Sequence, residues 1–400
     1  MYTLKVLKHK VWMKVIGLVL RLLKSPRPMV LVGEDSSVRL AKLVASKGSR
    51  HVLLVTDRDL VSLGLHEKCH RTLAAAGVEV TVHSDISPNP TIEQIEEGVS
   101  LGKRAGCDTV FALGGGSPID AGKIISARLT NDVTTESLEG FLKVKNKPLP
   151  FYAVPTTAGT GSEVTQGAIV TNTQQQRKYS IGDAKLVPLA TALDPLLMKG
   201  LPPVVTAATG MDALTHAIEA YLVTFATSEV RENASIAVKL IFDNLREAYN
   251  NGDNLDAREA MAVAAYHGGM AITDAGVGYV HAMAHQLGGI YHVPHGLANA
   301  VLLPHVLDFS KNHVTRQLAE LARLIGLEGG SEVDLAEGFI REVRKLNRDL
   351  GLPATLPEIQ SRDIPRIVDR AIEEAFAASG VPCYMRPAQG AEILRVLSAS

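Results

Sequence analysis

Cysteine, net charge and internal repetition are scarce in this sequence, and each absence excludes a class of protein. The three cysteines, Cys69, Cys107 and Cys383, lie far apart. Such an odd, sparse set provides neither a disulfide framework nor a thiolate metal pair, and it predicts a reducing, cytoplasmic compartment. The formal net charge of −1 gives no reason to expect a nucleic-acid partner. No internal repeat is present, and 400 residues suffice for two domains with a large core.

Acidic side chains are missing from residues 1–27, which contain seven lysines or arginines, so the other 373 residues carry −8. Apolar residues recur at helical spacing between Val11 and Leu23, and basic residues flank them. The segment is too charged for a transmembrane span and lacks the cleavage site of a signal peptide. Two interpretations stay open. One is a helix with peripheral membrane contact, and the other is a helix packed on the protein itself or on a partner subunit.

Short apolar segments alternate with helical segments between residues 28 and 200. Strands followed by helices predict an α/β domain with a parallel, Rossmann-like sheet. Strand patterns stop after residue 201, and helical patterns follow one another to the C-terminus. We therefore predict a dinucleotide-binding α/β domain over residues 28–200 and an all-helical, metal-binding domain over residues 201–400, preceded by the segment 1–27.

Histidines are concentrated in one stretch, with four of the 13 between residues 281 and 295. His281 and His285 are four residues apart and would share one face of a helix. We expect Gly288-Gly289 to end that helix, so that the chain turns and His295 returns toward His281. Neutral imidazoles are good ligands for zinc, iron, copper or nickel. The alternative is a helix end with histidines that cap it or face solvent.

A second helical segment contains Asp212 and His216, again four residues apart. With His281 and His295 they form a set of one carboxylate and three imidazoles. This set suits Fe(II), Zn(II) or a similar divalent ion and does not suit a thiolate-type site. Taken singly, Asp212 is equally explained as a helix N-terminal charge, and His216 as a surface residue.

Residues 114–117, Gly-Gly-Gly-Ser, directly follow an expected strand, and we expect Pro118 to open the next helix. Glycines let the backbone approach a phosphate, and a helix N-terminus supplies free N–H groups for it. The pattern is not G-x-G-x-x-G, so a tight strand–helix turn is the alternative. Asp57 ends another strand, where a carboxylate accepts hydrogen bonds from a ribose and repels a 2′-phosphate. The alternative there is a surface aspartate in a turn.

These segments together resemble the iron-containing (group III) alcohol dehydrogenases, from about residue 28 to the C-terminus. The resemblance is carried by four motifs in order, residues 114–120, 155–165, 211–219 and 281–300. In that family the metal is bound by the equivalents of Asp212, His216, His281 and His295. The related glycerol dehydrogenases and dehydroquinate synthases use three protein ligands, so the fourth favours the iron group.

The resemblance implies a homodimeric alcohol dehydrogenase and aldehyde reductase that uses Fe(II), with Zn(II) as the alternative, and transfers hydride between a small alcohol and NAD. His285, outside the ligand set, is our candidate for proton relay or nicotinamide contact. Two other functions stay open, a zinc-dependent polyol dehydrogenase or lyase of the same superfamily and a non-catalytic binding protein on this fold. The cofactor-binding residues that we infer are Asp57, Asn89, Gly115, Gly116, Ser117, Asp120, Thr156, Thr157, Thr160, Ile169 and Lys178.

Overall fold

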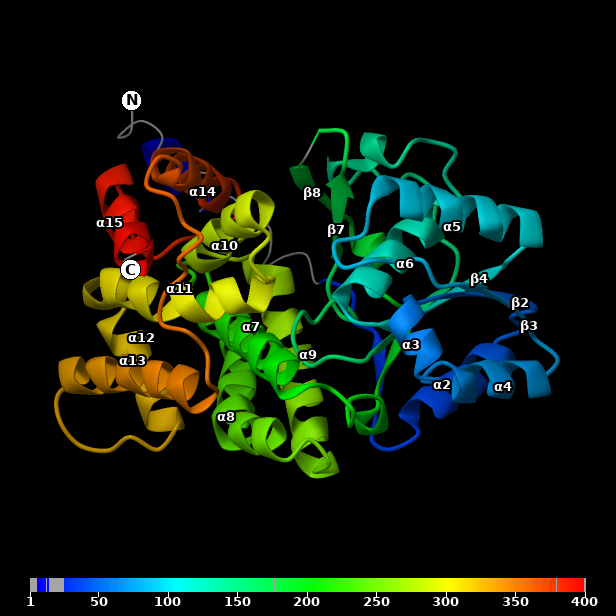
Figure 1. Ribbon diagram of the computed structural model, residues 1–400, viewed down its shortest axis with the longest axis horizontal. Coiled ribbons are helices and arrows are strands. Elements are labelled where there is room, and N and C mark those ends of the chain that lie inside the picture. Colours follow the sequence, from blue (N-terminus) through cyan, green and yellow to red (C-terminus); the bar gives the residue numbers. More distant parts are fainter. Residues whose placement is uncertain (1–5, 12, 14–24, 176, 379, 399–400) are drawn as a thin grey trace. The chain divides into compact units, whose positions relative to one another are not determined.

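The computed structural model describes residues 6–11, 13, 25–175, 177–378 and 380–398. The chain divides into two compact units, which we call the sheet unit and the helical unit. The sheet unit comprises residues 25–201 and 253–266, and the helical unit comprises the described residues among 1–24, 202–252 and 267–400. Figure 1 labels many of the helices and strands of both.

A six-stranded parallel sheet forms the centre of the sheet unit, in the order β1-β9-β6-β4-β2-β3. Apolar side chains fill β2 and β4 almost completely, as expected for strands covered on both faces. This confirms the parallel, Rossmann-like sheet that was predicted. Its strands are β1 (Met29–Val32), β2 (His51–Val55), β3 (Glu79–His83), β4 (Thr109–Gly114), β6 (Phe151–Pro155) and β9 (Ala190–Leu193).

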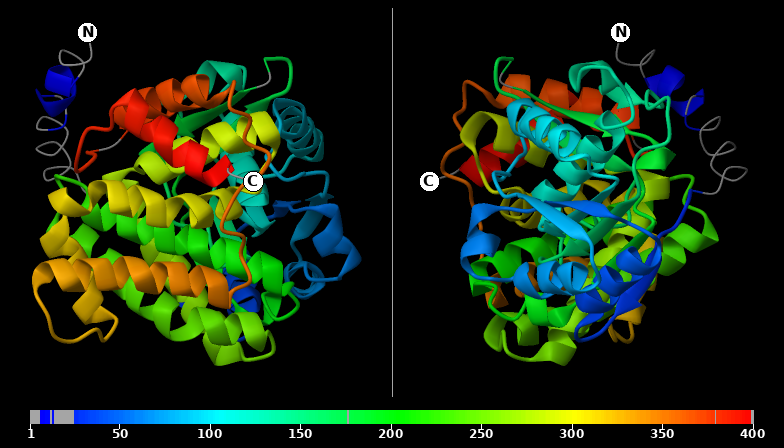
Figure 2. Two further views of the ribbon diagram at one scale, coloured as in Figure 1. Left: turned by 60° about the vertical axis from the view of Figure 1, so that its left-hand side comes forward. Right: turned by 90° about the vertical axis from the view of Figure 1, so that its right-hand side faces the viewer.

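Helices cover both faces of this sheet. One hydrophobic core joins α2 (Ser36–Ser46) and α4 (Glu67–Ala75) to the strands. The other core joins α5 (Ile92–Ala105) and α6 (Gly116–Arg128) to the opposite face (Figures 1 and 2). The prediction that Pro118 opens this helix is wrong. Helix α6 already begins at Gly116, with Gly115 as its N-cap, so Pro118 is its third residue.

A second, three-stranded sheet in the same unit was not predicted from the sequence. Its order is β5-β8-β7, and β7 and β8 form an antiparallel pair. The buried residues of β7 alternate with more exposed ones over only six positions, which is a weak signal in a sequence. The strands are β5 (Gly140–Phe141), β7 (Gly167–Asn172) and β8 (Arg177–Gly182). Short helical turns complete the unit, namely α3 (Arg58–Ser62), η1 (Glu136–Leu138), η2 (Ala184–Leu186) and η3 (Pro195–Leu197).

The helical unit confirms the predicted helical C-terminal region. Its elements are α7 (Pro203–Leu222), α8 (Ser228–Asn250), α10 (Tyr279–Tyr291), α11 (His295–Ser310), η4 (Lys311–His313), α12 (Thr315–Leu324), α13 (Glu332–Asp349), α14 (Ile364–Ala378) and α15 (Pro387–Ser398). Helix α9 (Leu255–Ala275) begins in the sheet unit and ends in the helical unit.

Helix α10 is longer than predicted. It continues through Gly288-Gly289 and ends at Tyr291, and its C-cap His292 has a left-handed φ of 57°. A glycine inside a helix costs only about 1 kcal/mol, and packing of α10 against α11 and α14 outweighs that cost. The turn before His295 was predicted correctly, although the helix that begins there was not.

The described part of the N-terminal segment, residues 6–11 and 13, is helical and packs on the helical unit. His9 is buried, its ring stacks on Phe376 with centroids 5.0 Å apart, and its Nδ1 lies 3.0 Å from Tyr384 Oη. These contacts fit the interpretation of a helix packed on the protein. Most of the predicted apolar stripe, at residues 12 and 14–24, lies outside the described residues.

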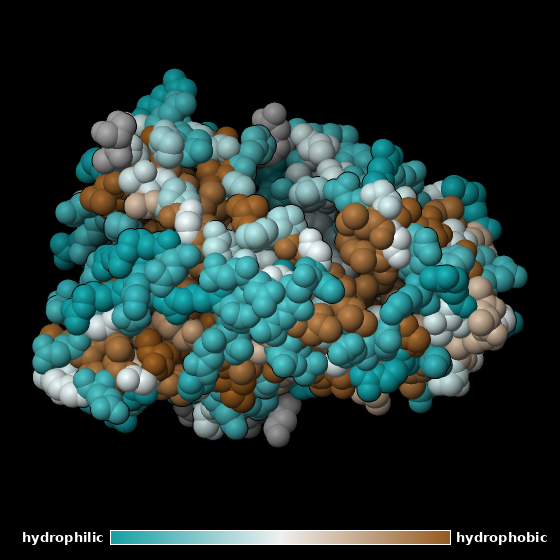
Figure 3. All heavy atoms as spheres, turned by 60° about the horizontal axis from the view of Figure 1, so that its bottom comes forward, coloured by the Kyte–Doolittle hydropathy of each residue, from teal (hydrophilic) through white to brown (hydrophobic). Residues whose placement is uncertain are grey.

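Charges of both signs are nearly balanced, with 41 basic and 42 acidic residues. On the face shown in Figure 3, hydrophilic side chains are interspersed with hydrophobic ones. Within the described ranges, none of the helices combines the length and the apolar character that crossing a membrane requires.

Candidate metal centre and cofactor site

Helix α7 directs Asp212, His216 and Glu219 to one buried face, because they are four and three residues apart. Nearly all side chains of α7 from Gly210 to Leu222 are buried, and most are apolar. Polar groups in such an environment need partners, since an unpaired buried polar group costs free energy. The structure provides these partners from α10 and α11.

Three candidate ligands meet in the interior of the helical unit. Ligand atoms of Asp212, His216 and His281 all lie within 4.8 Å of one another. The rings of His216 and His281 stack with centroids 4.5 Å apart. His281 Nε2 is buried 3.6 Å from Asp212 Oδ1 and has no hydrogen-bond partner among the described residues. A divalent cation fits here, because it would take the lone pair of that nitrogen beside a carboxylate.

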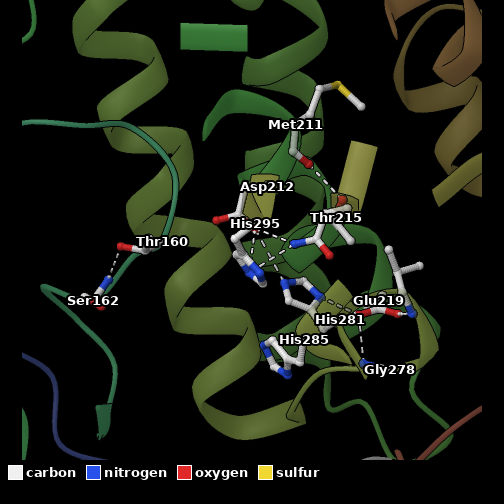
Figure 4. Close-up of polar contacts among 12 residues, drawn as sticks. Thr160, Ser162, Met211, Asp212, Thr215, Glu219, Gly278, His281, His285 and His295 are labelled. Carbon is white, nitrogen blue, oxygen red and sulfur yellow. Dashed lines mark hydrogen bonds and ion pairs between the residues drawn. The ribbon is translucent and has the colours of Figure 1, made fainter. Parts of the chain in front are cut away.

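His295, the first residue of α11, lies beside the same carboxylate. Its Nε2 is 3.3 Å from Asp212 Oδ1, and its ring centroid is 5.4 Å from that of His281. Asn299, one turn later, donates to Asp212 Oδ1 over 2.7 Å, and its Nδ2 lies 3.2 Å from His295 Nε2. Three helices thus bring together one carboxylate and three imidazoles, a donor set that suits Fe(II). Figure 4 shows Asp212, His281 and His295 of this set.

The electrostatics of this cluster follow from burial and mutual proximity. Burial favours a raised pKa for Asp212, but the imidazoles of His216, His295 and His281 together lower this pKa below its usual range. Burial acts to lower the pKa of His281, yet the neighbouring carboxylates of Asp212 and Glu219 raise it to about 9. Metal binding at His281 therefore has to release a proton, and affinity should increase with pH.

Glu219, which the sequence reasoning missed, holds His281 in place. Its Oε2 accepts hydrogen bonds from His281 Nδ1 (2.7 Å) and Gly278 N (2.8 Å), and its Oε1 accepts one from Val280 N (2.7 Å). The carboxylate thereby caps the start of α10 and leaves His281 Nε2 for the metal site (Figure 4). A Cβ at Gly278 would lie 2.7 Å from Glu219 Oε1, so a larger residue there would displace the carboxylate.

His285 lies one turn after His281, next to the candidate ligands. Its ring stacks on that of His295, with centroids 5.2 Å apart and planes 14° from parallel. Its Nδ1 hydrogen-bonds to Glu374 of α14, so the ring is held from the side of α14. The side chain of His285 is 31% exposed, whereas that of His281 is 2% exposed.

The predicted cofactor residues of the glycine-rich turn gather where β4 ends. A Cβ at Gly116 would lie 2.8 Å from Thr160 Cγ2, and one at Gly115 would lie 3.5 Å from Thr157 Oγ1. This close approach leaves a cradle of backbone N–H groups at the start of α6, which suits a phosphate. Thr156 N donates to Gly114 O over 3.0 Å and links the turn to the end of β6.

Two smaller contacts extend this region. Asn89, which has a left-handed φ of 62°, donates its backbone N–H to Ser117 Oγ over 3.1 Å. Lys178 Nζ donates to Asn89 Oδ1 over 2.6 Å. The chain thus brings Asn89, Ser117 and Lys178 together from three segments that are far apart in the sequence.

Asp120 has both carboxylate oxygens engaged within the protein. They accept hydrogen bonds from Ser162 Oγ (2.8 Å) and Ile169 N (2.9 Å). Asp120 therefore holds the start of β7 and the preceding loop against α6. Asp57 is the N-cap of α3, and its Oδ1 accepts a hydrogen bond from Leu60 N over 2.8 Å.

Models of one protein family match the N-terminal and the C-terminal part of the chain. Residues 27–195 match the family described as "Iron-containing alcohol dehydrogenase", and residues 206–400 match "Fe-containing alcohol dehydrogenase family, C-terminal". The chain belongs to the iron-containing alcohol dehydrogenase family and is an oxidoreductase. This confirms the family and the enzyme class that the sequence predicted.

Relatives match over most of the chain. The 1,3-propanediol dehydrogenase of Klebsiella pneumoniae is 41% identical over 338 residues, 83% of this chain and 87% of that protein. The NAD-dependent methanol dehydrogenase of Bacillus methanolicus is 36% identical over 356 residues, 88% and 93% of the two chains. The lactaldehyde reductase of Escherichia coli K12 is 38% identical over 349 residues, 86% and 91% of the two chains. A crystal structure of 1,3-propanediol oxidoreductase has a TM-score of 0.90 at 38% identity and covers 94% of this chain and 99% of its own.

Proposed function

We propose that this protein is an NAD-dependent, iron-containing alcohol dehydrogenase that also reduces aldehydes. The observation that carries the proposal is the buried cluster of Asp212, His216 and His281, with His295 beside it. Relatives named for methanol, lactaldehyde and 1,3-propanediol support a small alcohol or aldehyde as the substrate. The methanol dehydrogenase of Bacillus methanolicus is named as NAD-dependent, which supports NAD as the cofactor.

The metal-binding side chains would be Asp212, His216, His281 and His295. When bound there, Fe(II) supplies a Lewis acid that polarises the substrate oxygen. Asp212 contributes the negative charge that a divalent cation requires. Because Glu219 occupies Nδ1 of His281, the imidazole can offer only Nε2 to the metal.

The sheet unit would bind NAD. The backbone of Gly115, Gly116 and Ser117 at the start of α6 would hold the pyrophosphate, and Asp57 would accept hydrogen bonds from the adenosine ribose. Asp120 would act by holding Ile169 in position. The remaining proposed contacts come from the hydroxyl-rich loop and the pair beside Ser117, namely Thr156, Thr157, Thr160, Asn89 and Lys178.

Oxidation of an alcohol by NAD releases a proton in addition to the hydride. His285 is our candidate to accept that proton, because it is partly exposed and lies beside the candidate ligands. We expect His285→Ala to keep the metal and to lower kcat by a factor of about 100 or more. Metal analysis and steady-state kinetics on the same preparation check this, and loss of the metal would show that His285 is a ligand instead.

We further propose a cytoplasmic homodimer. Strand β1 lies at the edge of the six-stranded sheet with Met29, Val30 and Val32 exposed, and such an edge can pair with a second copy. The three free cysteines support a reducing compartment. Light scattering should give twice the chain mass of 42.7 kDa, and a monomeric mass at micromolar concentration would reject the dimer.

The proposed activity is tested with protein purified without oxygen. Its metal content is measured, and the metal-free protein is reconstituted with Fe(II) or Zn(II). NADH oxidation is then followed with short and long aldehydes, and NAD reduction with the matching alcohols. We expect turnover with Fe(II). Turnover with Zn(II) alone would favour a zinc polyol dehydrogenase, and no turnover with any compound would favour a binding protein.

A further inference from the structure

Glu374 of α14 holds two consecutive side chains of α10. Its Oε1 accepts a hydrogen bond from His285 Nδ1, and its Oε2 accepts one from Gln286 Nε2 over 2.9 Å. The bond to Gln286 prevents the carboxylate from rotating away from the imidazole. The side chain of Glu374 is 34% exposed and that of His285 is 31% exposed, so both lie partly open to solvent.

The contact with Glu374 determines which nitrogen of His285 is available. A carboxylate can only accept, so His285 Nδ1 carries the proton, and the neutral ring has its lone pair on Nε2. The ring plane is also fixed, because it stacks almost parallel to His295. Both the tautomer and the orientation of His285 therefore depend on a residue that lies 89 positions further along the chain.

We propose that Glu374 is a positioning residue for His285, which it holds as the tautomer that accepts a proton at Nε2. This inference rests on the proposed role of His285. In alcohol oxidation the O–H bond of the substrate breaks and an Nε2–H bond forms, while the carbon-bound hydrogen leaves with its electron pair for NAD. In aldehyde reduction the same nitrogen returns the proton. Glu374 touches neither substrate nor cofactor in this scheme and acts only through the imidazole.

The test compares Glu374→Leu, Glu374→Gln, His285→Ala and the double variant Glu374→Leu/His285→Ala, all in the iron-loaded enzyme. Glu373→Leu is the matched control, since Glu373 is the exposed neighbour on the same helix. Metal content and thermal unfolding show whether each variant is folded and loaded. The values of kcat and KM for alcohol and NAD then report the chemistry.

We expect Glu374→Leu to keep its metal and both KM values and to lower kcat about tenfold or more. Glu374→Gln should recover to within about threefold of wild type, because its amide oxygen can accept from Nδ1 once Gln286 turns its own amide. In the His285→Ala background, the change at Glu374 should have no further effect, since two residues that act as one unit are not additive. Glu373→Leu should match wild type.

Each other result overturns the proposal, and the results distinguish its failure from that of the proposed function. A wild-type kcat for His285→Ala removes the role of His285 and the proposal with it. A slow His285→Ala enzyme together with a normal Glu374→Leu enzyme overturns only the role of Glu374. Additive effects in the double variant, or loss of metal in Glu374→Leu, would likewise assign Glu374 a purely structural role.

Discussion

Glu219→Gln is the perturbation that tests the metal centre while it leaves every candidate ligand in place. Three donors converge on this carboxylate, namely His281 Nδ1 and the backbone N–H groups of Gly278 and Val280. Two carboxylate oxygens can accept from all three donors. A carboxamide has one oxygen and one NH₂ group, so at least one donor would face another donor. No rotation of the amide avoids this conflict.

The magnitude follows from those contacts. An unsatisfied donor at this buried position costs about 1–3 kcal/mol. Removing the group that orients a ligating histidine typically weakens metal binding by a factor of about 10–100, which corresponds to about 1.4–2.7 kcal/mol. We therefore expect Glu219→Gln to be less stable but folded, and to bind a divalent ion about 10–100 times more weakly than wild type.

The assay is a competition titration of metal-free protein with Zn(II) or Co(II) against a chromophoric chelator. Tyr221→Phe is the matched control, because Tyr221 lies on the same helix and its hydroxyl donates to Glu320 over 2.8 Å. It loses one hydrogen bond but should keep wild-type metal affinity. Gly278→Ala should reproduce the effect of Glu219→Gln, since its Cβ would press on the carboxylate. Wild-type affinity in both Glu219→Gln and Gly278→Ala would refute the reasoning.

Three further predictions concern other parts of the chain. Burial raises the pKa of Glu163 from 4.5 to about 7, so the folded state binds the extra proton between these values, and this group's contribution to stability falls as pH rises from 4.5 to 7. Urea unfolding at pH 4.5 and at pH 7 measures this decline as a difference in the free energy of unfolding. Glu163→Gln should make that difference smaller by about 3 kcal/mol, and a difference equal to that of wild type would contradict the prediction. Asp57→Gly should shift the ratio of kcat/KM for NAD to that for NADP toward NADP, by an amount that corresponds to about 1–3 kcal/mol. If the unmodified enzyme prefers NADP, the proposed role of Asp57 is rejected. Six basic residues within residues 5–24 each contribute about 1 kcal/mol at an anionic membrane surface. This charge favours co-sedimentation of the full-length protein with anionic liposomes at low salt, whereas the packing of His9 on Phe376 and Tyr384 favours a segment that stays on the protein. Comparison with protein that starts at Pro28 decides between the two interpretations. Both proteins in the supernatant would exclude membrane contact.

The parts of this structure that the sequence predicted well depend on local spacing. The strands of the parallel sheet are short apolar segments bounded by turns, and Asp212 and His216 share a helix face because of helical geometry alone. Helix α11 was missed for a physical reason, since it is buried on most sides and has Pro304 in its interior. Such a helix shows no amphipathic period, and a proline normally argues against a helix.

The residues that support the candidate site could not be predicted, because each acts on a partner far away in the sequence. Glu219 lies 62 positions before His281, and Asn299 lies 87 positions after Asp212. No periodicity links such pairs, and only the packing of α7, α10 and α11 brings them together. The one local sign was that Glu219 follows His216 by three residues on the same helix face, where it could serve as a further polar partner for the cluster.

The central claim is that Asp212, His216, His281 and His295 bind one iron ion. The most direct measurement is an anomalous difference map at the iron absorption edge, from crystals of protein purified and grown without oxygen. We predict a single strong peak within bonding distance of all four side chains, and no peak in His216→Ala crystals of the same form. An iron peak elsewhere, or an undiminished peak in His216→Ala, would contradict the account.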